Sequence, residues 1–360
     1  MQTHTNIYNK IYAYENLLKA YKEARKSKTQ LTYVIAFTKE LKENLLQLQK
    51  ELKEETYQPH PLTTFTLRDP KLRIISKSIF KDRIIHHALV QVIEPLFDPT
   101  FIFDSHANRI GKGTAKALER YDLFLRKLTQ NGKNLYERGD TKFPKGYALK
   151  ADIKKYFDNV DQKILLEMIK RKIKDEEIIW LIRKILQNFT TEIQGKGMPL
   201  GNLTSQFFAN IYLNELDQFI KHILKIRYYI RYVDDFVILN ESKETLETYK
   251  EEINQFLKQT LKIELHPEKS KIISLSRGVQ LLGFRVFHTH KILRKKARRR
   301  IIIRLNEWKE LYDFGLLEPE QALEKILGWM AYAVQGNTYH LRKKLMKIFY
   351  KRFKLKNAKL

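Results

Sequence analysis

Apolar residues recur at two different spacings along this chain. In residues 1–55 they follow near-helical spacing among Lys and Glu, which predicts an N-terminal helical segment. The same spacing predicts further helices at residues 114–128, 162–188, 204–223 and 243–262. Short β-branched and aromatic runs predict strands at residues 63–66, 147–151 and 279–286, and residues 131–145 are expected to form a polar loop. The mixture of helices and short strands indicates an α+β fold.

The run at residues 228–239 is the most informative in the chain. Aromatic and β-branched residues lie on both sides of Asp234 and Asp235, which predicts two strands joined by a tight turn that carries both acids at its tip. Because Asp is common in turns, an ordinary hairpin is the alternative. Asp152 follows the predicted strand at 147–151 and supplies a third carboxylate. Mg²⁺ prefers carboxylate oxygens, and two such ions roughly 4 Å apart stabilise the attacking and leaving oxygens in phosphoryl transfer, so we expect a two-metal site.

Composition narrows the class of partner. The chain has 68 Lys and Arg against 41 Asp and Glu, a net charge of +27, which favours a polyanion such as nucleic acid over a merely solvated basic surface. It has no Cys, so disulfides and thiolate zinc sites are excluded, and its ten His show no metal-binding spacing. No run is apolar over transmembrane length, so we expect a cytoplasmic protein without a membrane partner.

The three acids and the motifs around them resemble those of reverse transcriptases over residues 60–290. That family carries Tyr-x-Asp-Asp on a hairpin of its palm and an earlier Asp on a neighbouring strand. The resemblance implies a right-hand polymerase with fingers, an antiparallel palm sheet and a helical thumb, which makes DNA from deoxynucleoside triphosphates on an RNA template. It also implies two Mg²⁺ ions bound by Asp152, the backbone carbonyl of Ile153 and Asp234, with Asp235 supporting the metal site electrostatically.

The resemblance divides the chain into four parts. Residues 1–56 would form a helical extension, 57–145 the fingers, 146–288 the palm and 289–360 the thumb, with a helical segment shared by fingers and palm at 162–205. Residues 291–360 hold 19 basic and 6 acidic residues, a net charge of +13. We therefore expect thumb helices that follow an RNA/DNA duplex through its phosphates rather than through its sequence.

Three arginines are expected to hold the triphosphate or the template. Arg68 and Arg73 lie on a predicted two-stranded flap, and Arg109 lies in the segment 103–114 that resembles the family's second motif. Arginine offers forked donors that suit phosphate oxygens. For any one of these residues, a solvated surface charge is the alternative.

Further site residues follow from the resemblance. Phe157 matches the aromatic steric gate that excludes a ribose 2′-hydroxyl, with a core aromatic as the alternative. Lys269 is a candidate general acid for the departing pyrophosphate, although a surface lysine fits the sequence equally well. Leu282, Gly283 and Phe284 resemble the hairpin that grips the primer, where Gly283 would permit close backbone approach; an ordinary core strand is the alternative.

The segment 198–206 departs from the pattern of most reverse transcriptases. Where they have Pro-Gln-Gly followed by a Ser-Pro pair, this chain has Leu200 before Gly201, and Gln206 after Ser205. An amide can hydrogen-bond the nucleotide or the new base pair and so reward correct geometry, whereas Leu offers only apolar contact. Leaving a buried polar group unpaired costs roughly 1 to 3 kcal/mol, so the loss of the amide contact could loosen base selection by about an order of magnitude.

The pattern Leu-Gly-x-x-x-Ser-Gln resembles one lineage, the reverse transcriptases of diversity-generating retroelements. The resemblance implies copying of a template-repeat RNA with errors concentrated at adenines, mutagenic retrohoming of the cDNA into a target gene, and a small basic accessory protein that forms a barrel-like oligomer. Neutral drift of Leu200 within another bacterial lineage is the alternative. A retron or group II intron-like enzyme, a template-independent defence polymerase and an RNA-binding scaffold also stay open. We expect no appended DNA-binding or endonuclease segment.

Overall fold

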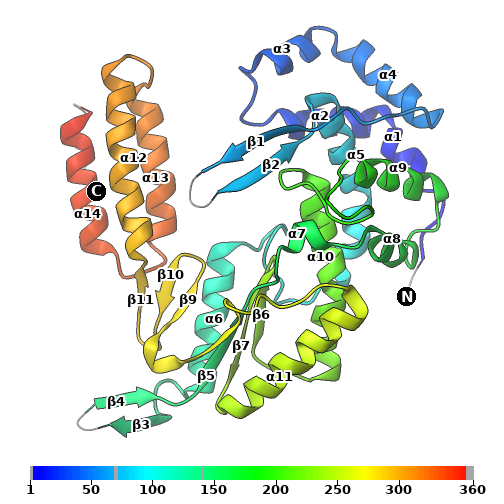
Figure 1. The fold of residues 1–360 in the computed structure, drawn as a ribbon. Helices are drawn as coiled ribbons and strands as arrows, with labels where there is room; N and C mark the ends of the chain where they lie inside the picture. Colours follow the sequence, from blue (N-terminus) through cyan, green and yellow to red (C-terminus); the bar gives the residue numbers. More distant parts are fainter. Residues whose placement is uncertain (1–2, 69–71, 139–140, 354–360) are drawn as a thin grey trace. The chain divides into compact units, whose positions relative to one another are not determined.

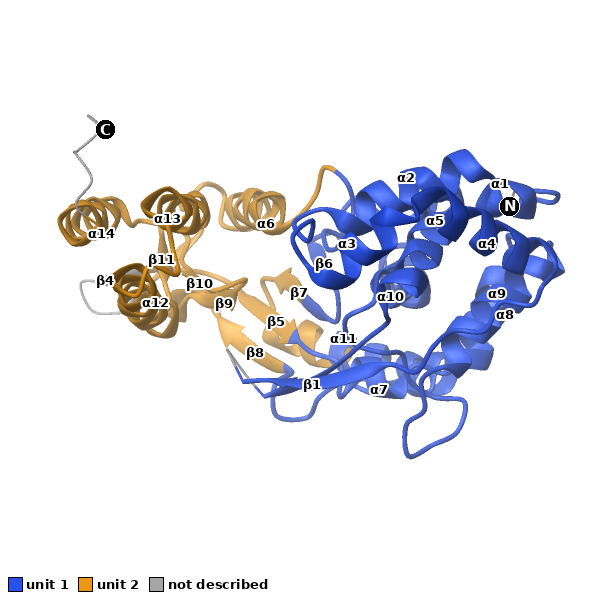
Figure 2. Cartoon of the chain, turned by 90° about the horizontal axis from the view of Figure 1, so that it is seen from above, with its two compact units in different colours: residues 1–110, 151–236, 249–270 blue, residues 111–150, 237–248, 271–360 orange. Residues whose placement is uncertain are grey.

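The computed structural model describes residues 3–68, 72–138 and 141–353 (Figure 1). The chain divides into two compact units. Unit 1 holds Met1–Ile110, Ala151–Phe236 and Tyr249–Ser270, and unit 2 holds Gly111–Lys150, Val237–Thr248 and Lys271–Leu360 (Figure 2). Each unit is therefore assembled from segments distant in sequence, and the division into extension, fingers, palm and thumb stays a prediction.

The helices expected near the N-terminus are present in unit 1. They are α1 (Tyr8–Tyr12), α2 (Tyr14–Arg25), α3 (Thr32–Lys39) and α4 (Leu41–Lys53). α5 (Phe80–Phe97) packs along α2 and leads into the short helix η1 (Asp98–Thr100). Leu17 of α2, Leu45 of α4 and Leu89 of α5 are fully buried, because the apolar stripe of each helix faces its neighbours rather than water.

A two-stranded flap precedes α5. Its strands, β1 (Thr63–Leu67) and β2 (Arg73–Lys77), are antiparallel, with Leu67 opposite Arg73. β1 is exposed along its whole length. The Ser76 amide donates to the Leu200 carbonyl at 3.0 Å, so the flap is tied to the segment that carries the Leu-Gly pattern.

The predicted helix at residues 162–188 is two helices, which corrects the sequence prediction. After α7 (Tyr156–Asn159), α8 spans Gln162–Lys170 and α9 spans Glu176–Gln187. Asp175 lies in the break, where its carboxylate accepts the Ile7 amide at 2.6 Å and the Tyr8 amide at 2.9 Å. These two hydrogen bonds fasten the start of α1 to the break between α8 and α9. α10 (Leu203–Gln218) and a π-helical turn, η2 (Phe219–Ile223), occupy the predicted helix at 204–223.

A four-stranded sheet with the order β6-β7-β5-β8 carries the predicted acids. Its strands are β5 (Tyr147–Ala151), β6 (Tyr229–Tyr232), β7 (Asp235–Asn240) and β8 (Lys271–Ser274). β5 and β8 are antiparallel, with Leu149 opposite Ile272. The turn between β6 and β7 consists of Val233 and Asp234, so Asp235 opens β7 rather than sharing the tip as predicted. α11 (Lys243–Phe256) and the π-helical turn η3 (Leu257–Leu261) follow.

The segment predicted as a polar loop at 131–145 contains a hairpin in unit 2. β3 (Leu135–Arg138) and β4 (Thr141–Pro144) pair antiparallel, and Tyr136 lies opposite Phe143. Their ring centroids are 5.7 Å apart in a stacked arrangement. Cross-strand aromatic pairs stabilise hairpins. The sequence does not predict the hairpin, because the charged residues around Tyr136 and Phe143 make the segment look like a polar loop. α6 (Thr114–Leu128), just before the hairpin, has the predicted bounds.

The rest of unit 2 is a small sheet followed by three helices. β9 (Val279–Leu281), β10 (Phe284–Val286) and β11 (Lys291–Leu293) form a sheet of order β11-β10-β9, preceded by the short helix η4 (Leu275–Arg277). α12 (Lys295–Asp313), α13 (Pro319–Ala333) and α14 (Tyr339–Arg352) share an apolar core that includes Leu305, Ile326 and Phe349. Within the described ranges, no helix combines the length and the apolar character needed to cross a membrane.

Candidate active site

Asp152 lies immediately after β5, and its backbone is held by a later segment. Its amide donates to Ser270 Oγ at 3.3 Å, and the same hydroxyl donates to the Asp152 carbonyl at 3.3 Å. The His266 amide donates to that carbonyl at 2.7 Å. These bonds, all within unit 1, fix the point at which the Asp152 carboxylate leaves the strand.

The Asp152 carboxylate is paired with Lys269. Lys269 Nζ lies 2.5 Å from Asp152 Oδ2, and the lysine side chain is 50% exposed whereas the aspartate side chain is 14% exposed. The ammonium thus takes a position that a metal cation would compete for, and its exposure lets it move into solvent. The general-acid role of Lys269 stays a prediction.

The β6–β7 turn presents Asp234 and Asp235 in a strained conformation. Val233 has a φ of +57°, in the left-handed region that a β-branched residue rarely adopts. Such strain costs on the order of 1 to 3 kcal/mol and is typical of functional sites. The surrounding structure must therefore hold this turn in place.

The electrostatics of the site indicate a place for a cation. Burial, together with the negative charges of Asp152 and Asp235, raises the pKa of Asp234 from its ordinary 3.8 to about 6. Carboxylates that repel one another gain from a bound cation, and carboxylate oxygens are the donors that Mg²⁺ prefers. Among the residues that the structure describes, no three His, Cys, Asp or Glu side chains already form a metal-binding group. The donor set suits Mg²⁺, and binding would require the Lys269 ion pair to open.

Phe157 lies on α7, next to the segment that carries Leu200. Its carbonyl accepts the Met198 amide at 2.7 Å, and its ring stands edge-on to that of Tyr156, with centroids 5.3 Å apart. Tyr156 is buried and donates its hydroxyl to the Ala209 carbonyl at 2.8 Å, while Phe157 is only half-buried. The core aromatic is therefore Tyr156, and the partly exposed ring of Phe157 keeps the steric-gate prediction open.

Leu200 lines a cavity of about 430 Å³ between β2, α7 and residues 189–193. Gly201 has a φ of +128°, and a Cβ there would lie 2.9 Å from Ile75 Cγ2, so a side chain at this position would collide with β2. Ser205 is buried in the first turn of α10, whereas Gln206 is exposed. Leu200 thus contributes an apolar wall at the base of the flap.

Arg68 and Arg73 lie at the free end of the flap. Arg73 opens β2 and Arg68 directly follows β1, and both residues are exposed. Forked donors on an exposed flap are placed to meet a charged ligand arriving from solvent. Their role in triphosphate binding stays a prediction.

Arg109 uses its donors within its own segment, and its predicted contact with the triphosphate or the template stays a prediction. Its Nε and Nη2 donate to the Asp98 carboxylate at 2.6 and 3.2 Å, and Nη2 also donates to the Asp98 carbonyl at 3.2 Å. Its Nη1 donates to the carbonyls of Ile102 at 2.8 Å and Ser105 at 3.1 Å. These bonds use all five N–H donors of an arginine. The side chain is also only 8% exposed, so Arg109 closes its own loop in this structure.

The turn Leu282–Phe284 packs against Tyr332 within unit 2. Gly283 has a φ of +90°, and a Cβ there would lie 1.8 Å from the Tyr332 hydroxyl, which donates to the Leu282 carbonyl at 3.2 Å. Phe284 is fully buried, with its ring centroid 4.9 Å from that of Tyr332. The close approach that Gly283 permits in this structure is therefore that of Tyr332, and the Phe284 ring is buried against it. A primer contact by Leu282, Gly283 and Phe284 stays a prediction.

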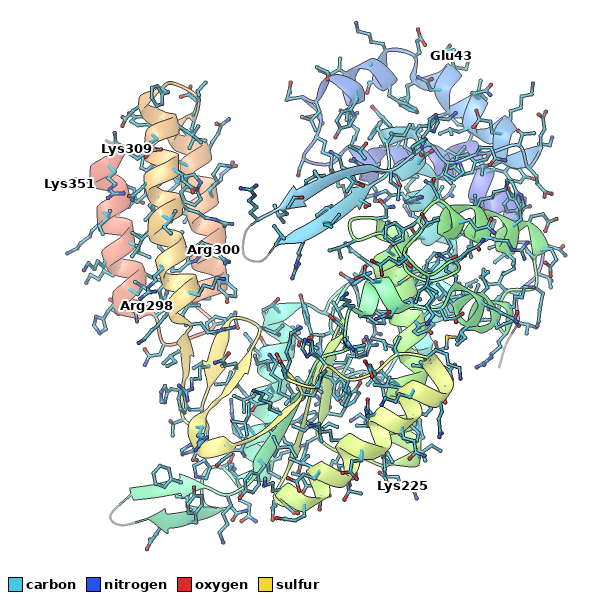
Figure 3. All side chains as sticks on the ribbon, viewed as in Figure 1. Glu43, Lys225, Arg298, Arg300, Lys309 and Lys351 are labelled. Carbon is cyan, nitrogen blue, oxygen red and sulfur yellow. The ribbon has the colours of Figure 1, made fainter. Side chains whose placement is uncertain are left out.

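Basic side chains gather on the helices of unit 2. Figure 3 labels Arg298, Arg300 and Lys309 on α12 and Lys351 on α14. A cavity of about 550 Å³ lies where β10 and β11 meet the first turns of α12 and α14. Its cationic lining residues are Arg285, Arg294, Lys295, Lys296 and Arg298. Within the described part of the chain its lining includes no Asp or Glu, so the cavity suits phosphate oxygens.

Residues 67–286 match the protein family described as reverse transcriptase (RNA-dependent DNA polymerase). The chain belongs to the reverse transcriptase family. It is 26% identical to protein YkfC of Escherichia coli strain K12 over 290 residues, covering 70% of this chain and 71% of YkfC. It is also 26% identical to the group II intron-encoded protein LtrA of Lactococcus lactis over 312 residues, covering 67% of this chain and 49% of LtrA. The chain thus spans about half the length of that intron-encoded relative.

The fold of this reverse transcriptase is also similar to a solved structure. Apo telomerase from Candida tropicalis matches with a TM-score of 0.51 and 14% identity, covering 82% of this chain and 62% of the telomerase chain. At this identity the likeness shows the fold alone. Together with the family match and the antiparallel strand pairs, it confirms the predicted α+β right-hand polymerase fold.

Sequence reasoning missed three residues that shape the site. His266 and Ser270, which hold the Asp152 backbone, flank Lys269 in a segment where only the lysine drew attention. The third is Arg231, which is fully buried although it lies among the aromatic residues of β6. A charged residue inside a predicted buried strand signals a buried partner, but the sequence does not name that partner.

Proposed function

We propose that this reverse transcriptase makes error-prone cDNA from a template-repeat RNA in a diversity-generating retroelement. The observation that supports the polymerase activity is the environment of Asp234, where burial and the negative charges of Asp152 and Asp235, all within unit 1, raise the pKa of its carboxyl. The position of Leu200, as an apolar wall of the cavity at the base of the flap, supports the error-prone character.

The proposed chemistry assigns a role to each carboxylate. When bound, two Mg²⁺ ions would stabilise the attacking and leaving oxygens of nucleotidyl transfer. Asp152 and Asp234 would bind the ions most directly, and the Ile153 carbonyl would add a ligand. Asp235 would add negative charge without direct contact. The held backbone of Asp152 and the strained turn before Asp234 both restrict where these carboxylates can point.

Other residues would select and hold the substrate. Arg68 and Arg73 would bind the triphosphate of an incoming deoxynucleotide through their forked donors. Phe157 would exclude ribonucleotides, because its ring would stand where a 2′-hydroxyl projects. Leu200 would contact the nucleotide without a directional hydrogen bond. A mispaired nucleotide would therefore lose less binding free energy beside Leu200 than beside an amide side chain.

The proposed partners follow from charge. The cationic cavity and the basic helices of unit 2 would bind the phosphates of an RNA/DNA duplex without reading its sequence. A small basic accessory protein that forms an oligomer would act with the polymerase in the retroelement, a partner proposed from the resemblance to that lineage and not from charge.

A group II intron-like polymerase is the rival, and the similarity to LtrA of Lactococcus lactis favours it. Primer extension followed by product sequencing separates the retroelement enzyme from the intron-like enzyme. The reaction contains a defined RNA template, Mg²⁺ and deoxynucleotides, and is run with and without the candidate accessory protein. The retroelement proposal expects errors clustered opposite template adenines. Accurate cDNA would assign the enzyme to another lineage, and the absence of templated product would contradict the polymerase proposal.

One pair of variants tests the role of Leu200 in the same assay. Leu200→Gln restores an amide at this position and should lower the error rate by up to about tenfold. Leu200→Met is the matched control, because it preserves apolar contact and similar volume, and should leave the error rate within about twofold. Equal error rates in wild type and Leu200→Gln would contradict the assignment.

A further inference from the structure

Arg231 on β6 is fully buried although its side chain is charged. Its Nε and Nη2 donate to the two oxygens of the Asp217 carboxylate on α10, at 2.8 and 2.6 Å. Its Nη1 donates to Asn210 Oδ1 at 3.2 Å and to the Val233 carbonyl at 2.9 Å. Tyr229 donates its hydroxyl to the same Asp217 at 2.7 Å. A buried network in unit 1 thus reaches the turn that carries Asp234.

Stability alone does not explain a buried pair of this kind. Removing a guanidinium and a carboxylate from water costs free energy that their attraction often fails to recover, and apolar residues of similar volume are frequently as stable in such positions. What a forked ion pair does supply is defined geometry, because each donor requires its acceptor in one place. The bond from Arg231 to the Val233 carbonyl indicates that the defined geometry is that of the β6–β7 turn.

Val233 is the strained residue of the metal-site turn. Its φ of +57° is unfavourable for a β-branched side chain, so this conformation persists only while neighbouring groups hold it. The Val233 carbonyl belongs to the same planar peptide as the Asp234 N–H. The bond from Arg231 therefore sets the plane of that peptide. Asp234 directly follows this peptide, so the plane of the peptide influences where the Asp234 side chain points.

The strand that carries Arg231 is itself fastened to another segment. The Arg231 amide donates to the Asp104 carbonyl at 3.0 Å, and the His106 amide donates to the Arg231 carbonyl at 3.0 Å. Asn210 Nδ2 donates to the Ala107 carbonyl at 2.9 Å. Arg231 and Asn210 thereby join β6, α10 and residues 104–107. The turn rests on a frame of three segments that are distant in sequence.

We propose that Arg231 is a positioning residue for nucleotidyl transfer, which holds the turn through the Val233 carbonyl in the conformation from which Asp234 binds Mg²⁺. The inference rests on the proposed metal-binding role of Asp234. The fully buried Arg231 side chain would act only through the Val233 peptide, without contact to metal or substrate. Losing a partner that orients a metal ligand typically costs 10- to 100-fold in metal affinity or activity, so we expect an effect of that order.

Two variants separate positioning from folding. Arg231→Lys keeps a positive charge beside Asp217, but a single ammonium cannot span Asp217 and Val233 together. Arg231→Met combined with Asp217→Leu removes both charges, so no unpaired charge stays buried. Tyr57→Phe is the matched control, because it deletes a buried hydrogen bond of the same kind elsewhere in unit 1, the 3.0 Å bond from Tyr57 to the Asp82 carboxylate.

Metal binding and catalysis are measured separately on these proteins. Mn²⁺ binding is followed by the electron paramagnetic resonance signal of the free ion, and primer extension is followed across Mg²⁺ concentrations. Both Arg231 variants should bind Mn²⁺ about tenfold more weakly and need about tenfold more Mg²⁺ for half-maximal extension, while KM for the primer–template stays within about twofold. Tyr57→Phe should match the wild type in all three measurements.

The outcomes distinguish this inference from the proposed function. Wild-type Mn²⁺ affinity and Mg²⁺ dependence in either folded Arg231 variant would overturn the positioning role. Asp234→Ala provides the second comparison. If Asp234→Ala also binds Mn²⁺ and extends primers as the wild type does, the proposed metal site itself is wrong. If Asp234→Ala is inactive and the Arg231 variants behave normally, only the positioning role is wrong.

Discussion

Replacing Asp234 by asparagine should stabilise the metal-free protein while abolishing polymerisation. Burial and the charges of Asp152 and Asp235 raise the pKa of Asp234 from 3.8 to about 6. At about 1.4 kcal/mol per pH unit, ionised Asp234 therefore costs about 3 kcal/mol of folding free energy above pH 6. Asparagine keeps the shape of the side chain and removes the charge, so it removes most of this cost.

The pH dependence of the effect follows from the direction of the shift. The folded chain binds this proton more tightly than the unfolded chain, so the cost is absent below pH 3.8 and grows as the pH rises toward 6. Asp234→Asn should thus raise the free energy of unfolding by less than about 1 kcal/mol at pH 4. At pH 7.5 it should raise the free energy of unfolding by about 2 to 3 kcal/mol, which corresponds to a rise in Tm of about 3 to 4 °C for a chain of this length.

Calorimetry with a chelator present measures this effect directly. Wild type and Asp234→Asn are compared at pH 4, 6 and 7.5, and addition of Mg²⁺ at pH 7.5 should stabilise the wild type more than the variant. Asp158→Asn is the control, because Asp158 is an exposed acid on α7 and its loss should change stability by less than about 0.5 kcal/mol. An Asp234→Asn variant that is no more stable than wild type at pH 7.5, or equally stabilised at pH 4, would refute the reasoning.

Three further predictions concern residues outside the acid cluster. Arg109→Ala should lower the free energy of unfolding by about 2 kcal/mol, because it breaks the ion pair with Asp98. It should leave KM for deoxynucleotides within twofold, and a large rise in that KM would instead show that Arg109 contributes to nucleotide binding. Gly283→Ala should cost about 2 to 3 kcal/mol in denaturant unfolding, and adding Tyr332→Phe should recover part of the loss; no recovery would show that backbone strain alone is responsible. Phe157→Ala should raise ribonucleotide incorporation in primer extension. Unchanged selection between deoxyribose and ribose would contradict the prediction that Phe157 is the steric gate.

The acids and the fold were predictable because they depend on local patterns. Asp152 at the end of a short strand and Asp234 in a hairpin turn follow from runs of β-branched and aromatic residues, and the structure has both. The helix Thr114–Leu128 follows equally well from its apolar spacing. In these elements, local preference and tertiary packing agree.

The sequence could not reveal the partners of several side chains, because tertiary packing decides them. Arg109 fits a phosphate site by sequence, but Asp98 and two carbonyl groups use its donors. Phe284 fits a primer grip by motif, but Tyr332 covers its ring. The pairing of Arg231 with Asp217 joins a strand to a helix, and nothing local to either residue identifies the other. Sequence patterns indicate that a buried charge needs a partner without saying which residue provides it.

Templated extension by paired acid variants tests the central claim most directly. The wild type, Asp152→Asn and Asp234→Asn are each given an RNA template, a DNA primer, deoxynucleotides and Mg²⁺, and RNA affinity is measured on the same preparations. We predict full-length cDNA from the wild type, no extension from either variant, and RNA affinities within about twofold of one another. Extension at wild-type rates by either variant would contradict the assignment of these carboxylates as the metal site.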